Sequence, residues 1–259
     1  MGTKEYKRLH AEWYELASAE GDHSKEIDFW VRSIEASSEP VLELGSGTGR
    51  VLVPLLERGF DVSGIDTSED MMDRCRAACQ AKGLKAELYE QSMLEFDLPR
   101  KFGLVILNSG GLGLFVSDQD IHCAFERVMA HLKPGGLFIY EFQPVPGEDN
   151  NRNDGKWTGD WLCRPDNLVM AWRTRQKYNA ATHVWESLFI VEKFLDGRLV
   201  ETEANERTGR YFTVDEAVQY ARAAGFEDIR ATNWLTEDPP SKNSLVITVR
   251  CRKPAEKVA

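Results

Sequence analysis

Residues 41–66 read VLELGSGTGRVLVPLLERGFDVSGID and hold the most informative pattern in the chain. A short apolar run leads into a turn with Gly45, Gly47 and Gly49, an apolar helical pattern follows, and a second short strand ends on Asp66. Glycines at such a turn let the backbone approach a ligand, and a carboxylate about 20 residues further on can accept the hydroxyls of a ribose. The stretch therefore predicts half of a nucleotide-binding βαβ unit.

The spacing of the glycines separates two kinds of nucleotide site. Dinucleotide enzymes use G-x-G-x-x-G, whereas GSGTGR places Arg50 where the third glycine of that motif belongs. The pattern E-x-G-x-G-x-G from Glu43 to Gly49, with Gly-Ile-Asp ending at Asp66, instead resembles the first motif of class I S-adenosylmethionine-dependent methyltransferases. This resemblance implies S-adenosyl-L-methionine as the cofactor and S-adenosyl-L-homocysteine as the product.

Two later segments extend the resemblance over nearly the whole chain outside residues 143–210. LKPGGLFI at 132–139 is similar to the family's turn into its fifth strand, and FTVDEAVQYARAAGFEDI at 212–229 is similar to its last helix and sixth strand. The implied fold is α/β, with a doubly wound, seven-stranded, mostly parallel Rossmann-like sheet whose last strand, expected at 244–251, runs antiparallel. The similarity is greatest to the small-molecule branch that includes sugar-amine and glycine N-methyltransferases.

Composition excludes several other functions. The chain has 259 residues, 42% of them hydrophobic and 29% charged, as is usual for a globular domain. A net charge of −10 without a basic patch disfavours nucleic acid as a partner. We expect a cytoplasmic protein without a membrane segment, because no signal core and no apolar segment of about 18 residues occurs. The five cysteines form no C-x-x-C pair and the five histidines are scattered, so no metal site is predicted.

Apolar spacing predicts how the chain is organised around this sheet. Residues 1–259 are expected to form a single methyltransferase domain, in which 1–36 supply a helical cap with helices at 3–19 and 24–36. Residues 143–210 are expected to be inserted after the fifth strand as a loop and an antiparallel meander. Within the insertion, the loop is expected at 143–165 and strands at 168–178, 183–195 and 198–208. This insertion could line or cap an acceptor pocket, or form a homodimer interface.

The resemblance also implies which residues contact the cofactor. The methionine part would lie against Glu43, Gly45, Ser46, Gly47 and Gly49, and the ribose against Asp66. The remaining implied contacts are Thr67, Met71, Ser92 and Met93 around the adenine, Asn108 beneath the sulfonium, and Tyr14 on the first helix. The sequence departs from the family at Gln91-Ser92-Met93, because the family commonly places an acid where this chain has Ser92.

The reaction that the resemblance implies is in-line transfer of the sulfonium methyl group to a nitrogen or oxygen of a small molecule. Positioning in a water-poor pocket supplies most of the acceleration in such a reaction. An amine that reacts in its neutral form needs no strong base, whereas a hydroxyl usually needs one. Tyr14, His183 and Arg210 are the candidate bases or orienting groups, although the sequence pairs none of them with a partner.

Three alternative functions remain at the level of the sequence. A nicotinamide-dependent oxidoreductase is disfavoured by Arg50 and by the absence of a Tyr-x-x-x-Lys pair. A nucleic-acid or protein methyltransferase is disfavoured by the acidic charge and by Asn-Ser-Gly-Gly at 108–111, where nucleic-acid amine methyltransferases typically carry Asn-Pro-Pro-Tyr, but these features do not exclude a protein acceptor. A non-catalytic cofactor-binding protein is disfavoured by the intact glycine motif.

Overall fold

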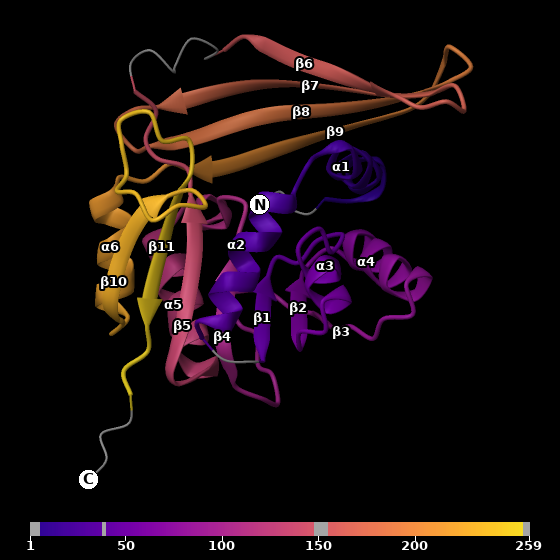
Figure 1. Ribbon diagram of the computed structural model, residues 1–259. Coiled ribbons are helices and arrows are strands. Elements are labelled where there is room, and N and C mark those ends of the chain that lie inside the picture. The colour runs from indigo at the N-terminus through magenta and orange to yellow at the C-terminus, as the bar shows by residue number, and fades with distance from the viewer. Residues whose placement is uncertain (1–5, 38–39, 148–154, 256–259) are drawn as a thin grey trace.

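The computed structural model describes residues 6–37, 40–147 and 155–255, and its centre is a seven-stranded sheet in the order β10-β11-β5-β4-β1-β2-β3 (Figure 1). Neighbouring strands from β3 to β5 pair in parallel, whereas β11 is antiparallel to both β5 and β10. The predicted fold class is therefore confirmed. The strands of this sheet are β1 (Val41–Leu44), β2 (Val62–Asp66), β3 (Glu87–Glu90), β4 (Phe102–Leu107), β5 (Leu132–Phe142), β10 (Glu227–Asn233) and β11 (Ile247–Arg252).

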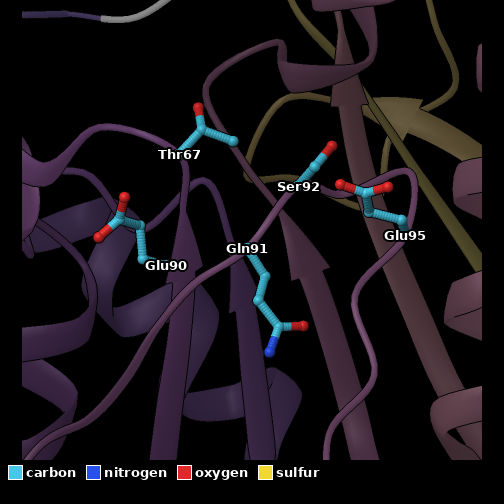
Figure 2. A pocket seen from close by; sticks show the side chains of 5 residues that line it. All are labelled: Thr67, Glu90, Gln91, Ser92 and Glu95. Atoms are coloured by element: carbon cyan, nitrogen blue, oxygen red, sulfur yellow. The ribbon is translucent and has the colours of Figure 1, made fainter.

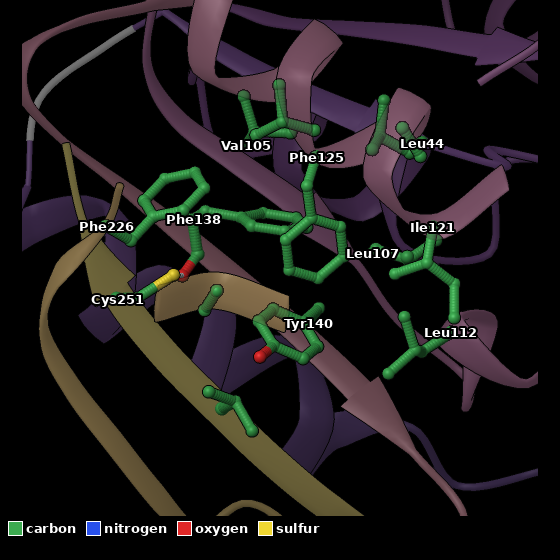
Figure 3. Close-up of a cluster of buried hydrophobic side chains, with 14 of the residues drawn as sticks. Leu44, Val105, Leu107, Leu112, Ile121, Phe125, Phe138, Tyr140, Phe226 and Cys251 are labelled. Atoms are coloured by element: carbon green, nitrogen blue, oxygen red, sulfur yellow. Dashed lines mark hydrogen bonds between the residues drawn. The ribbon is translucent and has the colours of Figure 1, made fainter. Parts of the chain in front are cut away.

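Helices cover both faces of the sheet, as the continuous apolar strands require. In β4 the side chains of Val105 and Leu107 pack on the face covered by α5 and α6, and those of Leu104 and Ile106 pack on the opposite face (Figure 3). Strand geometry causes this division, because successive side chains point to opposite faces. The helices are α1 (Arg8–Glu20), α2 (Ser24–Glu35), α3 (Leu52–Glu57), α4 (Glu69–Ala81), η1 (Gly111–Leu114), α5 (Asp118–His131) and α6 (Val214–Ala223).

A second, four-stranded antiparallel sheet, which we call the meander sheet, follows β5 in the chain. It consists of β6 (Trp157–Cys163), β7 (Leu168–Asn179), β8 (Val184–Leu195) and β9 (Arg198–Arg210). The last three strands were predicted. The prediction of a loop over 143–165 was wrong at β6, which pairs with β7 from Trp157↔Arg175 to Cys163↔Val169. Gly159 and Asp160 obscured this strand, because such residues favour turns and only pairing with β7 reveals the edge strand. Residues 148–154 of that predicted loop lie outside the described residues.

The helix α1 fills the space between the meander sheet and the carboxyl edge of the parallel strands (Figure 1). Leu9 of α1 is buried with Met170, Phe189 and Val191 of the meander sheet. Polar contacts border this apolar cluster: the ammonium of Lys193 lies 2.7 Å from the carboxylate of Glu12, and other contacts join Arg8 to Glu201 and the Leu9 amide to Glu203. The predicted helix over 3–19 is thus observed from Arg8 onward, and residues 3–5 lie outside the described ranges.

Arg207 of β9 adds a second type of contact, between the meander sheet and the residues that lead into α1. Its guanidinium carbon lies 4.3 Å from the ring centre of Tyr6 and 4.1 Å from that of Phe189, and Nη1 donates a 3.2 Å hydrogen bond to the Tyr6 hydroxyl. Cation–π contacts of this kind strengthen when water is excluded. The first helix and the insertion therefore form one packed unit, although they lie far apart in the sequence.

The structure also bears on membranes and metals. Over the described ranges, no helix is both long enough and apolar enough to cross a membrane. In the same part of the chain, no group of three or more His, Cys, Asp or Glu side chains is placed to hold a metal ion.

Replacing Leu9 by alanine should separate the contribution of α1 docking from the rest of the fold. Leu9 is 1% exposed, so we expect Leu9→Ala to lower the free energy of unfolding by about 2–5 kcal/mol in urea denaturation. Leu199→Ala is the matched control, because Leu199 is 53% exposed and its loss should cost no more than about 0.5 kcal/mol. Equal effects of the two substitutions would contradict the docking of α1 that we describe.

Candidate functional site

The turn between β1 and α3, residues 45–50, is held in a conformation that depends on glycine. Gly45, Gly47 and Gly49 have φ angles of +68°, +54° and +85°. These angles belong to the left-handed region, in which side chains with a Cβ atom are strained. A Cβ atom on Gly49 would also lie 2.7 Å from Sγ of Cys75, whereas one on Gly45 would meet nothing within 4 Å. The turn is therefore tightly packed where it meets α4 and open at its first glycine.

The neighbouring elements hold this glycine turn closely. A Cβ atom on Gly64 of β2 would lie 2.6 Å from Oγ of Ser46, and one on Gly47 would lie 3.1 Å from Cε of Met71. The Ser46 amide donates a 2.9 Å hydrogen bond to the carbonyl oxygen of Ile65. Of the predicted contacts, Ser46, Gly47 and Met71 are thus brought together at the end of β2.

Asp66 ends β2 and ties the glycine turn to the start of α4. Its Oδ2 accepts a 2.8 Å hydrogen bond from the Gly47 amide, and its Oδ1 accepts a 2.9 Å bond from the Ser68 amide. Ser68 also caps α4, because its hydroxyl accepts from the Met71 amide. A carboxylate oxygen can accept more than one hydrogen bond, so these two amide contacts are compatible with hydrogen bonds from hydroxyl groups.

Glu43 and Asn108 meet beneath the glycine turn, from β1 and from the end of β4. The amide Nδ2 of Asn108 donates a 2.6 Å hydrogen bond to Oε1 of Glu43, which is 2% exposed. Oε2 of Glu43 has no hydrogen-bond partner among the described residues. Burial raises the pKa of Glu43 to about 8, although the bond from Asn108 acts in the opposite direction. This carboxyl group is therefore poised to change charge when a ligand alters its surroundings.

Arg50, the last residue of the glycine turn, connects three other parts of the site. Its guanidinium pairs with Glu26 of α2, donates to the Ser109 hydroxyl after β4, and lies 3.4 Å from both the Tyr14 hydroxyl of α1 and Nδ1 of His23. Burial disfavours the charged guanidinium, but the ion pair with Glu26 outweighs this effect and raises the pKa of Arg50. In the sequence analysis Arg50 served only as an argument against a pyrophosphate site. Its role in connecting the helices to the glycine turn was missed, because nothing near it in the chain indicates a partner.

Glu141 is a second residue that sequence reasoning missed. It lies in β5, is 1% exposed, and accepts hydrogen bonds from the Ser109 amide at 2.7 Å and from the Trp234 indole at 3.0 Å. Burial raises the pKa of Glu141 to about 8, and the neighbouring charge of Glu26 adds to this effect. The sequence did contain a signal for this residue, namely an acid inside an apolar strand, because a buried carboxyl group requires hydrogen-bond partners.

Thr67 and Ser92 line a hollow of about 490 Å³ beside the end of β2 (Figure 2). Its other lining residues are Glu90, Gln91 and Glu95. Ser92 begins a turn in which its hydroxyl accepts from the Leu94 amide at 3.2 Å. The side chain of Met93 is partly buried against the adjacent hydrophobic cluster. The structure thus places the two predicted hydroxyl residues on one hollow, of a volume usual for small-molecule sites.

His183 and Arg210 lie together at another place, near the starts of α5 and α6. Nη1 of Arg210 lies 2.6 Å from Oδ1 of Asp118 and Nη2 lies 3.1 Å from Oε1 of Glu216, while Nδ1 of His183 lies 3.6 Å from the same glutamate. No hydrogen bond or ion pair between described residues joins either side chain to the glycine turn. Of the three candidate bases, only Tyr14 contacts a residue of that turn, through Arg50.

Comparison with known proteins identifies the type of domain. Residues 41–136 match the family described as "Methyltransferase domain". A protein of Geobacillus sp. (strain WCH70), provisionally described as a methyltransferase, is 24% identical over 90% of this chain and 94% of its own length. The dTDP-3-amino-3,4,6-trideoxy-α-D-glucopyranose N,N-dimethyltransferase of Streptomyces venezuelae is 27% identical over 52% of this chain and 58% of its own length.

A solved structure extends the comparison to the fold of the whole chain. The S-adenosylmethionine-dependent methyltransferase of Clostridium acetobutylicum ATCC 824 superposes with a TM-score of 0.77 at 19% identity, over 94% of this chain and 97% of that one. The match thus includes the insertion as well as the central sheet. With the glycine turn and Asp66 at the carboxyl edge of β1 and β2, these findings confirm the resemblance seen in the sequence: residues 41–136 match a methyltransferase domain, and the whole chain has the fold of an S-adenosylmethionine-dependent methyltransferase.

Proposed function

We propose that the protein binds S-adenosylmethionine along the carboxyl edge of β4, β1 and β2 and transfers its methyl group to an amino group of a sugar-like small molecule. The main support for this cofactor site is the glycine turn, which has the buried carboxyl group of Glu43 on one side and the carboxylate of Asp66 on the other. A turn with three left-handed glycines leaves its backbone accessible to a ligand. A carboxylate at the end of the second strand suits ribose hydroxyls.

The chemistry of the donor set fits this cofactor. Oε2 of Glu43 and Oγ of Ser46 are buried oxygens without a partner among the described residues, so a ligand with N–H groups would satisfy them. S-adenosylmethionine carries an ammonium and a sulfonium charge, which would also favour the ionised form of Glu43. In this proposal Gly45, Gly47 and Gly49 enclose the methionine part.

The remaining cofactor contacts follow from their places around the turn. Thr67 and Ser92 would line the adenine side of the hollow, and Met71 would pack under the ring from α4. Met93 would act through its backbone, because its side chain is taken up by the hydrophobic cluster. Asn108, fixed by Glu43, would lie beneath the sulfonium, and Tyr14 would close the site from α1.

The proposed mechanism is mainly one of positioning. When bound, the cofactor supplies an electrophilic methyl group, and the protein aligns a nucleophile behind it and excludes water. We propose that α1 and strands β7 to β9 of the meander sheet form the cover that excludes water, because they lie over the carboxyl edge as one packed unit (Figure 1). His183 and Arg210 would then stabilise the junction of this cover with α5 and α6 rather than exchange protons with the substrate.

An amine is the acceptor that the charges support. Glu26, Glu43 and Glu141 are all buried near the guanidinium of Arg50, so the site has more carboxyl groups than cationic partners among the described residues. Such a site attracts an amine as an ammonium ion, which must release its proton to a carboxylate of the site or to water before the nitrogen lone pair attacks the methyl group. A relative that methylates the amino group of a dTDP-linked sugar supports the same class of acceptor. The acidic surroundings also disfavour nucleic acid.

Two measurements would test this function. Calorimetric titration with S-adenosylmethionine, S-adenosylhomocysteine, NAD and NADP should show binding of the first two compounds only. Transfer of radiolabelled methyl groups should then be greater to amino sugars than to the same sugars with hydroxyl groups in place of the amine. Binding of NAD but not of S-adenosylmethionine would refute the proposed cofactor site, and transfer to hydroxyl sugars alone would refute the proposed acceptor.

Asp66→Asn should weaken the binding of S-adenosylhomocysteine at least about tenfold, because hydrogen bonds from ribose to a charged carboxylate are among the strong ones. Asp66 also holds the Gly47 amide, so affinity alone would not separate ribose contact from turn geometry. The 2′,3′-dideoxy analogue separates the two effects. Wild type should bind it more weakly than S-adenosylhomocysteine, whereas Asp66→Asn should bind the two compounds alike by calorimetry.

Asp73→Asn is the matched control, because Asp73 is an exposed residue of α4 that pairs only with Arg76 among the described residues. It should leave both affinities unchanged. If Asp66→Asn preserved the preference for the intact ribose, the assignment of Asp66 to the hydroxyls would be wrong.

The affinity for S-adenosylmethionine should rise with pH up to about 8, in accordance with the pKa of Glu43. Below that pH the carboxyl group is neutral in the free protein, and a cationic ligand must release its proton, so binding strengthens by up to about tenfold per pH unit. Above it, Glu43 is already ionised and contributes no further pH dependence. Glu43→Gln should bind more weakly at pH 8 and should lose this part of the pH dependence, as measured by calorimetry from pH 6 to 9.

A further inference from the structure

Trp234 lies at the edge of the sheet where we place the chemistry. Because β10 and β5 are both antiparallel to β11, they run in the same direction, and β10 ends at Asn233 on the carboxyl edge (Figure 1). The next residue, Trp234, is 44% exposed, yet its indole N–H donates a hydrogen bond to the buried carboxyl group of Glu141. One end of this side chain is therefore fixed while its ring faces open space.

Glu141 joins two segments, each of which contains a residue with a left-handed φ angle. Its Oε2 accepts from the amide of Ser109, which has a φ angle of +56°, and its Oε1 accepts from Trp234, which precedes Leu235 with a φ angle of +58°. Such angles are unfavourable for residues with a Cβ atom and persist where surrounding contacts enforce them. One buried carboxyl group thus bridges two strained turns, after β4 and after β10.

The main chain around Trp234 is fixed independently of Glu141. The Asn233 amide donates a 2.8 Å bond to the carbonyl oxygen of Asp238, and the Trp234 amide donates a 3.2 Å bond to that of Val246. The Asn233 side chain donates to the carbonyl oxygen of Pro239. The turn at 233–246 is therefore closed by its own backbone contacts, and the bond to Glu141 is left to set the direction of the indole ring.

Ser109 relates this ring to the cofactor site. Its hydroxyl accepts from Arg50 of the glycine turn, and Asn108 before it donates to Glu43. Since Glu141 binds both the Ser109 amide and the Trp234 indole, the ring lies across one carboxyl group from the loop that we place beneath the sulfonium. An acceptor that approaches the methyl group from beyond this loop would meet the indole.

We propose that Trp234 forms one wall of the acceptor site and that Glu141 is the positioning residue that sets the direction of its ring. A half-exposed indole with an anchored N–H offers an apolar face, which suits the C–H face of a sugar ring. This inference rests on the proposed function, because the wall gains its role from the cofactor beside it. It assigns Trp234 and Glu141 a part in acceptor selection.

A pair of cofactor analogues tests the wall without a known acceptor. The first probe is S-adenosylhomocysteine, and the second replaces its sulfur by a nitrogen that carries a methylene-linked pyranose, so that the arm leaves where the methyl group would. The measured quantity is the ratio of their dissociation constants by calorimetry. In wild type the arm should improve binding, and Trp234→Ala should reduce that improvement about five- to tenfold while leaving S-adenosylhomocysteine binding within about twofold.

A second exposed tryptophan provides the control for Trp234→Ala. Trp161→Ala removes another tryptophan, 66% exposed on β6, and should change neither constant. An arm that gives no improvement in wild type, or one whose improvement survives Trp234→Ala, would overturn the proposal. Failure of the proposed function has a different signature, because wild type would then not bind S-adenosylhomocysteine at all.

The role of Glu141 is tested by a cycle with two conservative variants. Trp234→Phe keeps an aromatic ring but loses the N–H, and Glu141→Gln keeps the shape but replaces one acceptor by a donor. Each should reduce the advantage of the armed probe about two- to threefold, and the double variant should lose no more than either single one. Trp234→Phe also identifies one indole N–H resonance, which should move in Glu141→Gln. Additive losses together with an unmoved resonance would refute the positioning role.

Discussion

The buried guanidinium of Arg50 is the interaction on which the assembly of the site depends. It contacts Tyr14 of α1, Glu26 of α2 and Ser109 after β4, so it joins the N-terminal helices to the central sheet at the glycine turn. A buried ion pair carries a desolvation cost, and breaking it leaves an uncompensated charge, which makes such a pair a strong constraint on geometry. Arginine suits this place because its planar group can donate in several directions at once.

The carboxyl groups around Arg50 explain how the site can accept cationic ligands without being unstable when empty. Glu43 and Glu141 have pKa values of about 8 because they are buried, so both can remain neutral at physiological pH. Binding of a cationic cofactor or amine would then favour the ionised form of these carboxyl groups, and the opposite charges would attract each other in the complex. The cost of an unpaired buried charge is avoided in the free protein and offset in the complex.

The sequence was sufficient for the sheet and the glycine turn, because both depend on short-range patterns. Three glycines, an apolar run before them and an acid at the end of the next strand lie within residues 41–66. Arg50, Glu141 and Trp234 were not assigned roles, because their partners are distant: Arg50 is 24 residues from Glu26, and Glu141 is 93 residues from Trp234. The edge strand β6 was missed for the same reason, since β7 is the strand that it pairs with among the described residues and its own composition favours a turn.

The docking of α1 on the meander sheet couples that sheet to the glycine turn. The apolar side of α1 carries Leu9, and its only extended apolar partner among the described elements is the face of the meander sheet that holds Phe189 and Val191. The same helix carries Tyr14, whose hydroxyl meets Arg50 at the glycine turn. A change in the packing of the meander sheet would therefore be transmitted through α1 to Arg50 at the glycine turn. A substitution in the meander sheet that keeps Tyr14 in place must therefore preserve the apolar contact with α1, because a close-packed interior tolerates little change in shape.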